Sequence, residues 1–150
     1  MSIPDSAAPS IDVEKQELID SLVRVSFGVT AVLSRVAAEY DLSLTQLRVL
    51  AILRDRRVRM SELASYLGLD RSTLSGLVDR AERRGLVQRE PNPDDGRAVD
   101  VFLTTSGAQL ARQGAEQIAG ALSPTIRQLT KIDARRLAAL LQQLLRPAGP

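Results

Sequence analysis

The sequence contains no cysteine and no histidine among its 150 residues. The lack of cysteine excludes disulfides, thiolate metal sites and thiol-oxidation sensing. The lack of histidine excludes a Ser-His or Cys-His nucleophile pair, an imidazole general base and a histidine-ligated zinc. Glycine-rich nucleotide loops and the Gly-x-Ser-x-Gly turn of hydrolases are also missing. We therefore predict a protein that is not an enzyme and needs no cofactor or metal. Catalysis by carboxylates alone is the alternative, although no acidic pair stands isolated in an apolar setting.

A targeting signal and a membrane-length apolar run are not expected either. The N-terminus, MSIPDSAAPSID, lacks the basic start and apolar centre of a signal peptide. The sequence has no run of ~18 apolar residues that could form a membrane span. We expect residues 1–11 to be a disordered lead-in and the protein to be cytoplasmic, with no membrane partner.

The net charge of +2 is small but unevenly distributed. Residues 1–41 carry 3 basic and 7 acidic groups, residues 42–97 carry 11 and 8, and residues 98–150 carry 6 and 3. Of the 20 basic residues, 18 are arginines. Arginine forms bidentate contacts with phosphates and base edges, so this bias favours a nucleic-acid partner. A GC-rich genome that selects arginine codons would produce the same bias.

Apolar periodicity predicts a mainly helical chain with one small β-hairpin, an α+β class. The first helix is apolar on more than one side, so it is expected to need a partner beyond its own domain. Asp12, Ser61, Asp70 and Asp133 are the expected N-caps, and Pro124 predicts a kink or a break at Ser123. The expected helices span residues 12–39, 43–55, 61–67 and 70–84, with two more starting near 104 and 133; the expected strands span 58–60, 86–90 and 98–104.

The spacing inside residues 60–79 is typical of a helix-turn-helix. Ala64 supplies a small residue where the two helices come closest, and Gly68 tolerates the positive φ of the turn. The hairpin after the second helix completes the order of a winged helix-turn-helix. Apolar residues lie on both inner faces at helical spacing: Leu63, Leu67, Leu69, Leu74, Leu77 and Val78.

The outer face of the second helix is polar, with small hydroxyls in its first turn. Such a face suits a helix that enters a major groove, because its N-terminal residues meet base edges and its free N–H groups attract phosphate. A helical hairpin with a merely solvated polar face is the alternative. The exposed residues would be Arg71, Ser72, Thr73, Ser75, Gly76, Asp79 and Arg80.

The loop PNPDDGRAVDV, residues 91–101, carries a single arginine at Arg97. Its two prolines restrict the backbone, and Asp-Gly favours a hairpin turn. Residues two apart in an extended chain project to the same side, so we expect the Asp95 carboxylate to pair with the Arg97 guanidinium. An arginine held in this way fits a narrow minor groove. The alternative is an ordinary exposed ion pair that contributes ~0–1 kcal/mol to stability.

The segment RMSELASYLGLDRSTLSGLVDRAERRGLVQREPNPDDGRAVDVFLT closely resembles the winged-helix core of the MarR family of bacterial transcriptional regulators. The wing signature, Asp-x-Arg followed by Leu-Thr, corresponds to Asp95, Arg97, Leu103 and Thr104, and the resemblance covers about residues 12–146. It implies a homodimer that reads a pseudo-palindromic operator on double-stranded DNA, with repression as the expected role. The predicted DNA-binding residues are Ser61, Arg71, Ser72, Thr73, Ser75, Gly76, Arg80, Asp95 and Arg97.

The resemblance also implies a division of the chain and a place for a ligand. Residues 12–42 and 104–146 would form the helical dimerisation region, and residues 43–103 the DNA-binding domain. A cleft between the two would take a small aromatic or anionic effector that loosens DNA binding. Arg24 and Arg48 are conceivable anion partners there, although both fit solvated helix faces better. An intramolecular helical bundle is the alternative to the dimer.

Two glycines depart from the family pattern. Many members carry an arginine in place of Gly76 and a basic residue in place of Gly96. Each lost phosphate contact should lower the magnitude of the salt slope by ~0.9. The departures therefore keep one alternative function open, a winged helix used for protein–protein contact with weak or no specific DNA binding.

Overall fold

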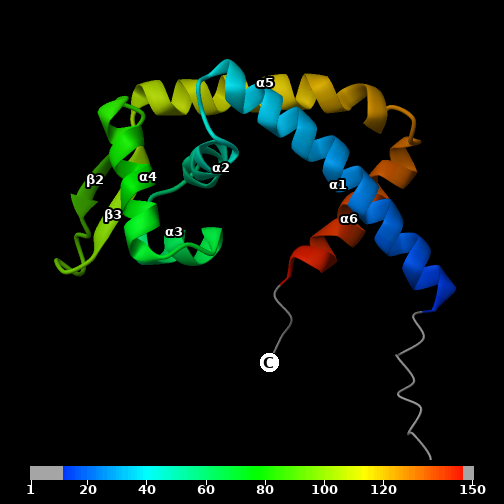
Figure 1. The fold of residues 1–150 in the computed structure, drawn as a ribbon, viewed down its shortest axis with the longest axis horizontal. Helices are drawn as coiled ribbons and strands as arrows, with labels where there is room; N and C mark the ends of the chain where they lie inside the picture. Colours follow the sequence, from blue (N-terminus) through cyan, green and yellow to red (C-terminus); the bar gives the residue numbers. More distant parts are fainter. Residues whose placement is uncertain (1–11, 147–150) are drawn as a thin grey trace, which may run out of the picture.

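The structure, a computed structural model, describes residues 12–146, which form six helices and three short strands (Figure 1). The predicted class is confirmed: the chain is mainly helical and carries a winged helix-turn-helix. The lead-in predicted for residues 1–11 lies outside the described residues. In chain order the elements are α1 (Val13–Glu39), α2 (Leu44–Leu53), β1 (Val58–Arg59), α3 (Met60–Leu67), α4 (Arg71–Arg83), β2 (Val87–Pro91), β3 (Val99–Leu103), α5 (Thr105–Ile126) and α6 (Lys131–Leu145).

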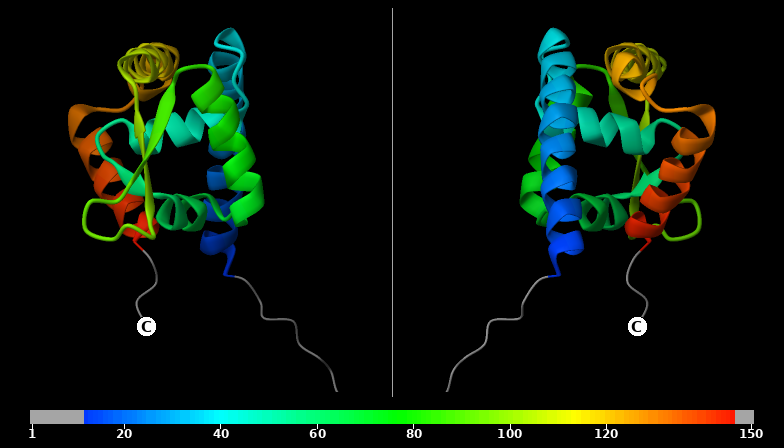
Figure 2. Two further views of the ribbon diagram at one scale, coloured as in Figure 1. Left: turned by 90° about the vertical axis from the view of Figure 1, so that its left-hand side faces the viewer. Right: turned by 90° about the vertical axis from the view of Figure 1, so that its right-hand side faces the viewer.

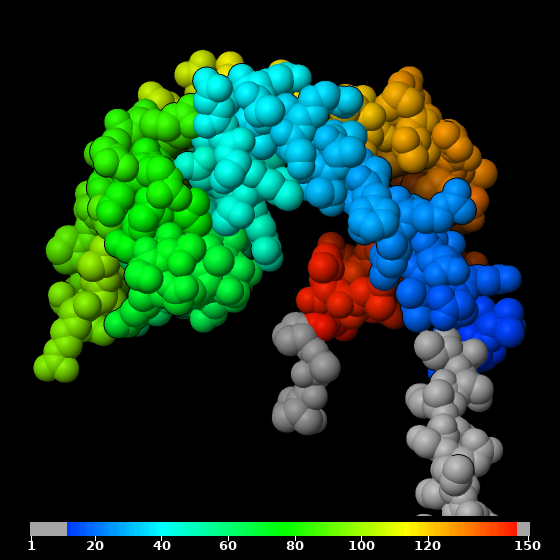
Figure 3. Space-filling view, in the orientation of Figure 1, coloured from blue at the N-terminus to red at the C-terminus, as the bar shows by residue number. Residues whose placement is uncertain are grey.

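The elements form an arch (Figures 1 and 3). Helix α5 runs along the top, with α2, α3, α4 and the small sheet below one end. Helix α1 crosses α5 and descends with α6 to form the other leg. A view turned by 90° shows α5 end-on, with α1 running down one side (Figure 2). The winged part and the long α1 therefore lie at opposite ends of the arch.

Local sequence signals account for most helix boundaries. Ser43 caps α2 in a capping box: Gln46 N–H donates to Ser43 Oγ at 3.1 Å, and Ser43 N–H donates to Gln46 Oε1 at 2.8 Å. Asp70 caps α4, as predicted. Gly68 ends α3 with φ of +64°, the left-handed conformation that its place in the turn requires.

Two predicted helix caps are wrong. Helix α3 begins one residue before Ser61, with Arg59 as its N-cap. Thr130 rather than Asp133 caps α6, because its hydroxyl accepts the Asp133 N–H at 3.1 Å. Of the two outcomes predicted at Pro124, a kink or a break at Ser123, the break does not occur, because α5 continues through Pro124 to Ile126. Pro124 cannot donate to the Gly120 carbonyl, so the helix loses one hydrogen bond. Both residues are exposed, and water can bond the freed carbonyl.

The sheet is antiparallel, with strand order β1-β3-β2. Val58 pairs with Val101, and β2 pairs with β3 from Val87↔Leu103 to Pro91↔Val99. Helix α5 starts tightly against this sheet, because a Cβ at Gly107 would overlap the Leu86 backbone. The largest fully buried side chains join α2, α3, α4 and the sheet in one core: Leu50, Leu53, Leu63, Leu74, Val78, Val87 and Val101.

The leg of the arch that α1 and α6 form exposes apolar surface. Helix α6 buries no residue within the described chain, and only Val36 and Ala37 of α1 are buried. By length and composition alone, α1 is also apolar enough to cross a membrane, with a mean hydropathy of 1.4 over an 18-residue window. The expectation that no such run exists is therefore wrong. The exposed apolar residues include Leu18, Ile19, Leu22, Val23, Val25 and Phe27 of α1 and Leu137, Leu140, Leu141, Leu144 and Leu145 of α6.

Candidate nucleic-acid interface

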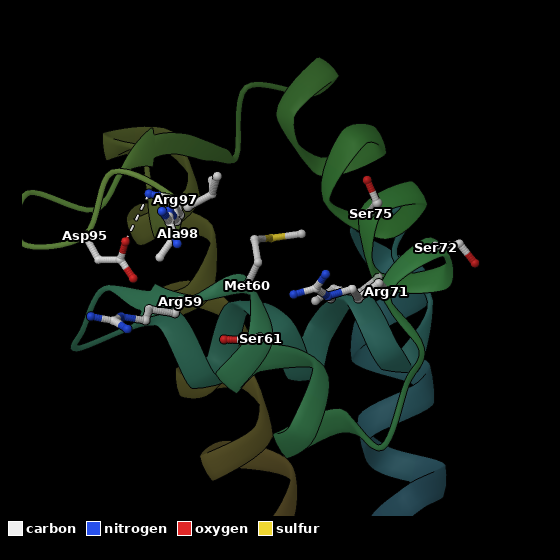
Figure 4. Close-up of a pocket in the computed structure, with 11 residues that line it drawn as sticks. Arg59, Met60, Ser61, Arg71, Ser72, Ser75, Asp95, Arg97 and Ala98 are labelled. Carbon is white, nitrogen blue, oxygen red and sulfur yellow. Dashed lines mark hydrogen bonds between the residues drawn. The ribbon is translucent and has the colours of Figure 1, made fainter.

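A groove of about 700 Å³ lies between α4 and the wing, the loop of residues 92–98 that joins β2 to β3. Figure 4 shows its two walls, with Met60 between them and the Arg71 side chain extending toward Met60. Six of the nine residues predicted to bind DNA line it: Ser61, Arg71, Ser72, Ser75, Asp95 and Arg97. Arg59 and Met60 also line it and were not predicted, whereas Thr73, Gly76 and Arg80 do not line it.

Asp70 organises the N-terminus of α4. Its carboxylate accepts the Thr73 N–H at 2.8 Å, the Ser72 hydroxyl at 2.7 Å and the Thr73 hydroxyl at 2.9 Å. These hydrogen bonds, first that from the Thr73 backbone, lower the pKa of Asp70 to about 2. Because both hydroxyl protons point to Asp70, the Ser72 and Thr73 oxygens can only accept from a ligand. In a major groove, such acceptors match the amino groups of adenine and cytosine.

The arginines of residues 71–89 have different partners. Arg89 bonds Glu82 at 2.6 Å and Asp79 at 2.5 Å, and the hydrogen bond to Glu82 in particular raises its pKa. The Arg84 guanidinium is bound to backbone carbonyls. Arg71, Arg80 and Arg83 are exposed, and no ion pair within residues 12–146 involves them. They are the cations that α4 can offer to phosphate.

Gly76 faces open space near Arg80. A Cβ at this position would meet only Arg80 Nη1, at 3.6 Å. Packing therefore does not require glycine here, and α4 has room for a larger side chain.

Asn92 organises the wing. Its Oδ1 accepts the N–H groups of Asp94 at 2.9 Å and Asp95 at 3.1 Å, and its own N–H donates to the Ala98 carbonyl at 2.8 Å. Its Nδ2 donates to both oxygens of Asp100, at 2.9 and 3.1 Å. One side chain thus joins the wing tip to a carboxylate on β3.

The predicted pairing of Asp95 with the Arg97 guanidinium is wrong. Asp95 Oδ1 accepts the backbone N–H of Arg97 at 3.1 Å, the dashed line in Figure 4. An aspartate in a turn commonly binds the backbone two residues ahead, and this local bond competes with an exposed ion pair. Asp95 therefore shapes the backbone below Arg97 and leaves the guanidinium available.

A buried carboxylate anchors the base of the wing. Asp100 is only 6% exposed, and besides Asn92 it faces Arg57 Nε at 3.9 Å. Arg57 also bonds Glu90 at 2.8 Å and lies 4.1 Å from the centroid of the Phe102 ring. Sequence reasoning missed Asn92, Asp100 and Arg57. The Asn-Pro-Asp-Asp run, which favours an Asx turn, was the one signal that could have indicated Asn92.

A separate apolar cleft of about 270 Å³ lies between α1, α2 and α5. Arg48 and Arg54 line it, and Arg48 donates to the Tyr66 carbonyl at 3.0 Å. Arg24 lines a different hollow, between α1 and α5, so the two arginines considered as anion partners are not brought together. Within residues 12–146, no cluster of three or more acidic side chains offers a metal site. The other residues of the apolar cleft are Leu33, Leu44, Leu47, Ala51, Ala111, Ala115 and Ile118.

Comparisons with known proteins agree with this geometry. The MarR family profile matches residues 40–98. The HTH-type transcriptional regulator PecS of Dickeya dadantii is 34% identical over 113 residues, which span 73% of this chain and 68% of PecS. The multiple antibiotic resistance protein MarR of Escherichia coli K12 is 31% identical over 115 residues, 75% of this chain and 80% of MarR.

Two similar solved structures contain DNA. Sco3205, a MarR family transcriptional regulator from Streptomyces coelicolor in complex with DNA, has a TM-score of 0.75 and 27% identity, covering 92% of this chain and 95% of Sco3205. A mutant MarR from E. coli complexed with operator DNA has a TM-score of 0.70 and 28% identity, covering 91% of this chain and all of that one.

Proposed function

Because the chain belongs to the MarR family of transcriptional regulators, which are not enzymes, we propose that it is a cytoplasmic repressor that binds a pseudo-palindromic operator as a homodimer. The groove between α4 and the wing is the observation that carries this proposal. The groove combines the N-terminus of a helix, small hydroxyls and two exposed arginines, Arg71 and Arg97. These are groups that bind the phosphates and base edges of DNA.

Each wall of the groove suits a different part of a DNA duplex. The first two turns of α4, with Ser72 and Ser75, would enter the major groove, where Arg71 and Arg80 meet phosphate. The wing would lie beside it and place Arg97 in the adjacent minor groove, where the negative potential is strongest when the groove is narrow. We assign DNA binding to residues 43–103.

The exposed apolar faces support the dimer. Helices α1 and α6 lie on the same leg of the arch (Figure 1), and both expose leucines there. A second copy with its own α1 and α6 would cover both faces at once. A membrane would not cover both faces in this way, because α1 is held against α2 and α5. We assign dimerisation to residues 12–42 and 104–146.

The apolar cleft between α1, α2 and α5 is where we place a small aromatic or anionic effector. It adjoins both regions, and its mostly apolar lining includes Arg48 and Arg54. Benzoate, as a probe of this chemistry, should release DNA from the wild type but not from Ala115→Phe, which fills the cleft. Release of DNA from both proteins would place the effector elsewhere.

A mobility-shift assay on the DNA upstream of the protein's own gene tests the main proposal. The wild type should bind specifically, and Arg97→Ala should lose roughly tenfold or more in affinity, which corresponds to ~1–3 kcal/mol for one groove-reading arginine. Arg112→Ala, which removes an exposed arginine of α5, is the matched control and should bind as the wild type does. Absence of binding even at low salt would favour the protein–protein alternative, and an unchanged affinity of Arg97→Ala would contradict the role of the wing.

A further inference from the structure

We propose that Arg84 fixes the angle between α4 and α1 and thereby sets the half-site spacing that the protein reads. This inference rests on the proposed dimeric DNA binding. It makes Arg84 a positioning residue, which acts on DNA through the helix that carries it.

The contacts of Arg84 connect the end of one helix to the end of another. Arg84 is the C-cap of α4. Its Nη1 donates to the Asp41 carbonyl and its Nη2 to the Tyr40 carbonyl, both at 2.8 Å. Tyr40 is the C-cap of α1, and Asp41 follows with φ of +54°. A planar guanidinium that spans two successive carbonyls is held in one orientation, and the partial negative charge at the end of α1 strengthens the contact.

The Arg84 contact joins α4 to α1, two helices whose main packing contacts are with other elements. Helix α4 makes its main contacts with α3 and β2, whereas α1 makes its main contacts with α5 and α2. Arg84 connects the two directly, across 43 to 44 residues of sequence. It is also the last residue before Gly85, where φ of +71° turns the chain into β2. The C-terminal end of α4 is therefore fixed by both its backbone and its side chain.

A change in the angle between α4 and α1 would change the spacing of the half-sites that a dimer contacts. Helix α4 has 13 residues, so it is about 20 Å long at ~1.5 Å per residue. A rotation of about 10° around its C-terminal end would move its N-terminus by roughly 3.4 Å, the rise of one base pair. Leu74 and Val78 hold α4 in the core of the winged domain, so without the Arg84 link the whole domain would turn with α4 relative to α1. In a dimer joined through α1, it could then follow half-sites that are one base pair too close or too far apart.

The test measures how strongly binding depends on half-site spacing. An operator is first selected from a random duplex library with the wild-type protein. Fluorescence anisotropy then gives the affinity for that duplex and for versions with one base pair inserted or deleted between the half-sites. Arg84→Gln removes the link, and Arg84→Lys keeps the charge but cannot span both carbonyls. Arg112→Gln removes an exposed arginine of α5, away from the groove, and is the matched control.

The wild type and Arg112→Gln should prefer the selected spacing by at least tenfold, and both Arg84 variants should reduce this preference threefold or more. If Arg84→Gln does not fold, Arg84→Lys decides the result. If Arg84→Lys prefers the selected spacing as strongly as the wild type does, the inference is overturned and the proposed function stands. The same holds if the Arg84 variants lose affinity equally at every spacing. Failure of the wild type to select any duplex overturns the proposed function and the inference together.

Discussion

Asp70 shows how one side chain can set the chemistry of a binding surface. Three hydrogen bonds hold its carboxylate at the start of α4 and orient the hydroxyls of Ser72 and Thr73. Because these bonds favour the charged form, they lower the pKa of Asp70 from 3.8 to about 2. A lowered carboxylate pKa stabilises the folded state fully above the unfolded pKa, and the contribution is lost as the pH falls toward the folded pKa.

Removal of the Asp70 carboxylate should therefore have a pH-dependent effect. Asp70→Ala should lower the free energy of unfolding at pH 7, and the difference from the wild type should shrink as the pH falls from 4 toward 2. Denaturant unfolding at several pH values measures this, and NMR titration of the Asp70 carboxyl carbon should give a midpoint near 2. A midpoint at the ordinary value of 3.8 would contradict the hydrogen-bonded geometry.

Gly76 should be replaceable without loss of stability. Gly76→Ala should raise the free energy of unfolding by about 1 kcal/mol, because alanine favours the helix and the site is open. Gly107→Ala is the contrasting control and should destabilise the protein, since its Cβ would overlap the Leu86 backbone. Denaturant unfolding at one protein concentration compares the three proteins. A loss of stability in Gly76→Ala would show that the site is more crowded than the structure indicates.

Sequence patterns identified which residue types would lie near the groove but not how each would be used. Arg71 and Arg84 look alike in the sequence, yet one lines the groove and the other binds carbonyls more than 40 residues away. Such partners become known only when the fold brings distant segments together. The same limit applied to the Asp95 carboxylate, for which the backbone N–H of Arg97 competed with the Arg97 guanidinium.

At the scale of elements, the wing is the part whose order depends most on polar contacts. It has few apolar side chains, and its tip is connected to β3 through Asn92 and the buried Asp100. The order of the helices and strands was predictable because apolar periodicity encodes it. The caps of α3 and α6 were not, because several polar residues near each helix start could have served.

Loss of Asn92 should loosen the wing without unfolding the domain. Asn92→Ala should weaken specific DNA binding severalfold, and adding Arg97→Ala to it should cost less affinity than Arg97→Ala costs in the wild type. Gln88→Ala changes an exposed residue of β2 and should leave binding unaltered. Anisotropy titrations of the single and double variants measure the coupling. Full additivity would mean that Asn92 does not position Arg97.

At the scale of the whole molecule, the arch places the groove at one end and the uncovered apolar leg at the other. The apolar periodicity of the first helix predicted that a partner is needed. Its arrangement could not be predicted, because apolar faces carry little directional information. Arginine is concentrated in the segment that forms most of the groove, since 11 of the 18 arginines lie in residues 42–97.

The leucine face of α6 should be essential for assembly. Leu141→Glu should shift the protein toward monomer, because a carboxylate would be buried without a partner. Gln142→Glu adds the same charge to the neighbouring exposed position on the polar side of α6 and should remain dimeric. Sedimentation equilibrium distinguishes these outcomes. Dimers of equal stability in both variants would exclude α6 from the interface.

Hydroxyl-radical footprinting on a selected operator tests the central claim most directly, because the radical reports protection of the minor groove. Two half-sites about 10 base pairs apart should appear, each flanked by a protected minor-groove tract. Arg97→Ala should lose both flanking tracts while the central protection remains. A single protected tract, or flanking protection that survives in Arg97→Ala, would contradict a dimeric regulator that reads the minor groove with its wing.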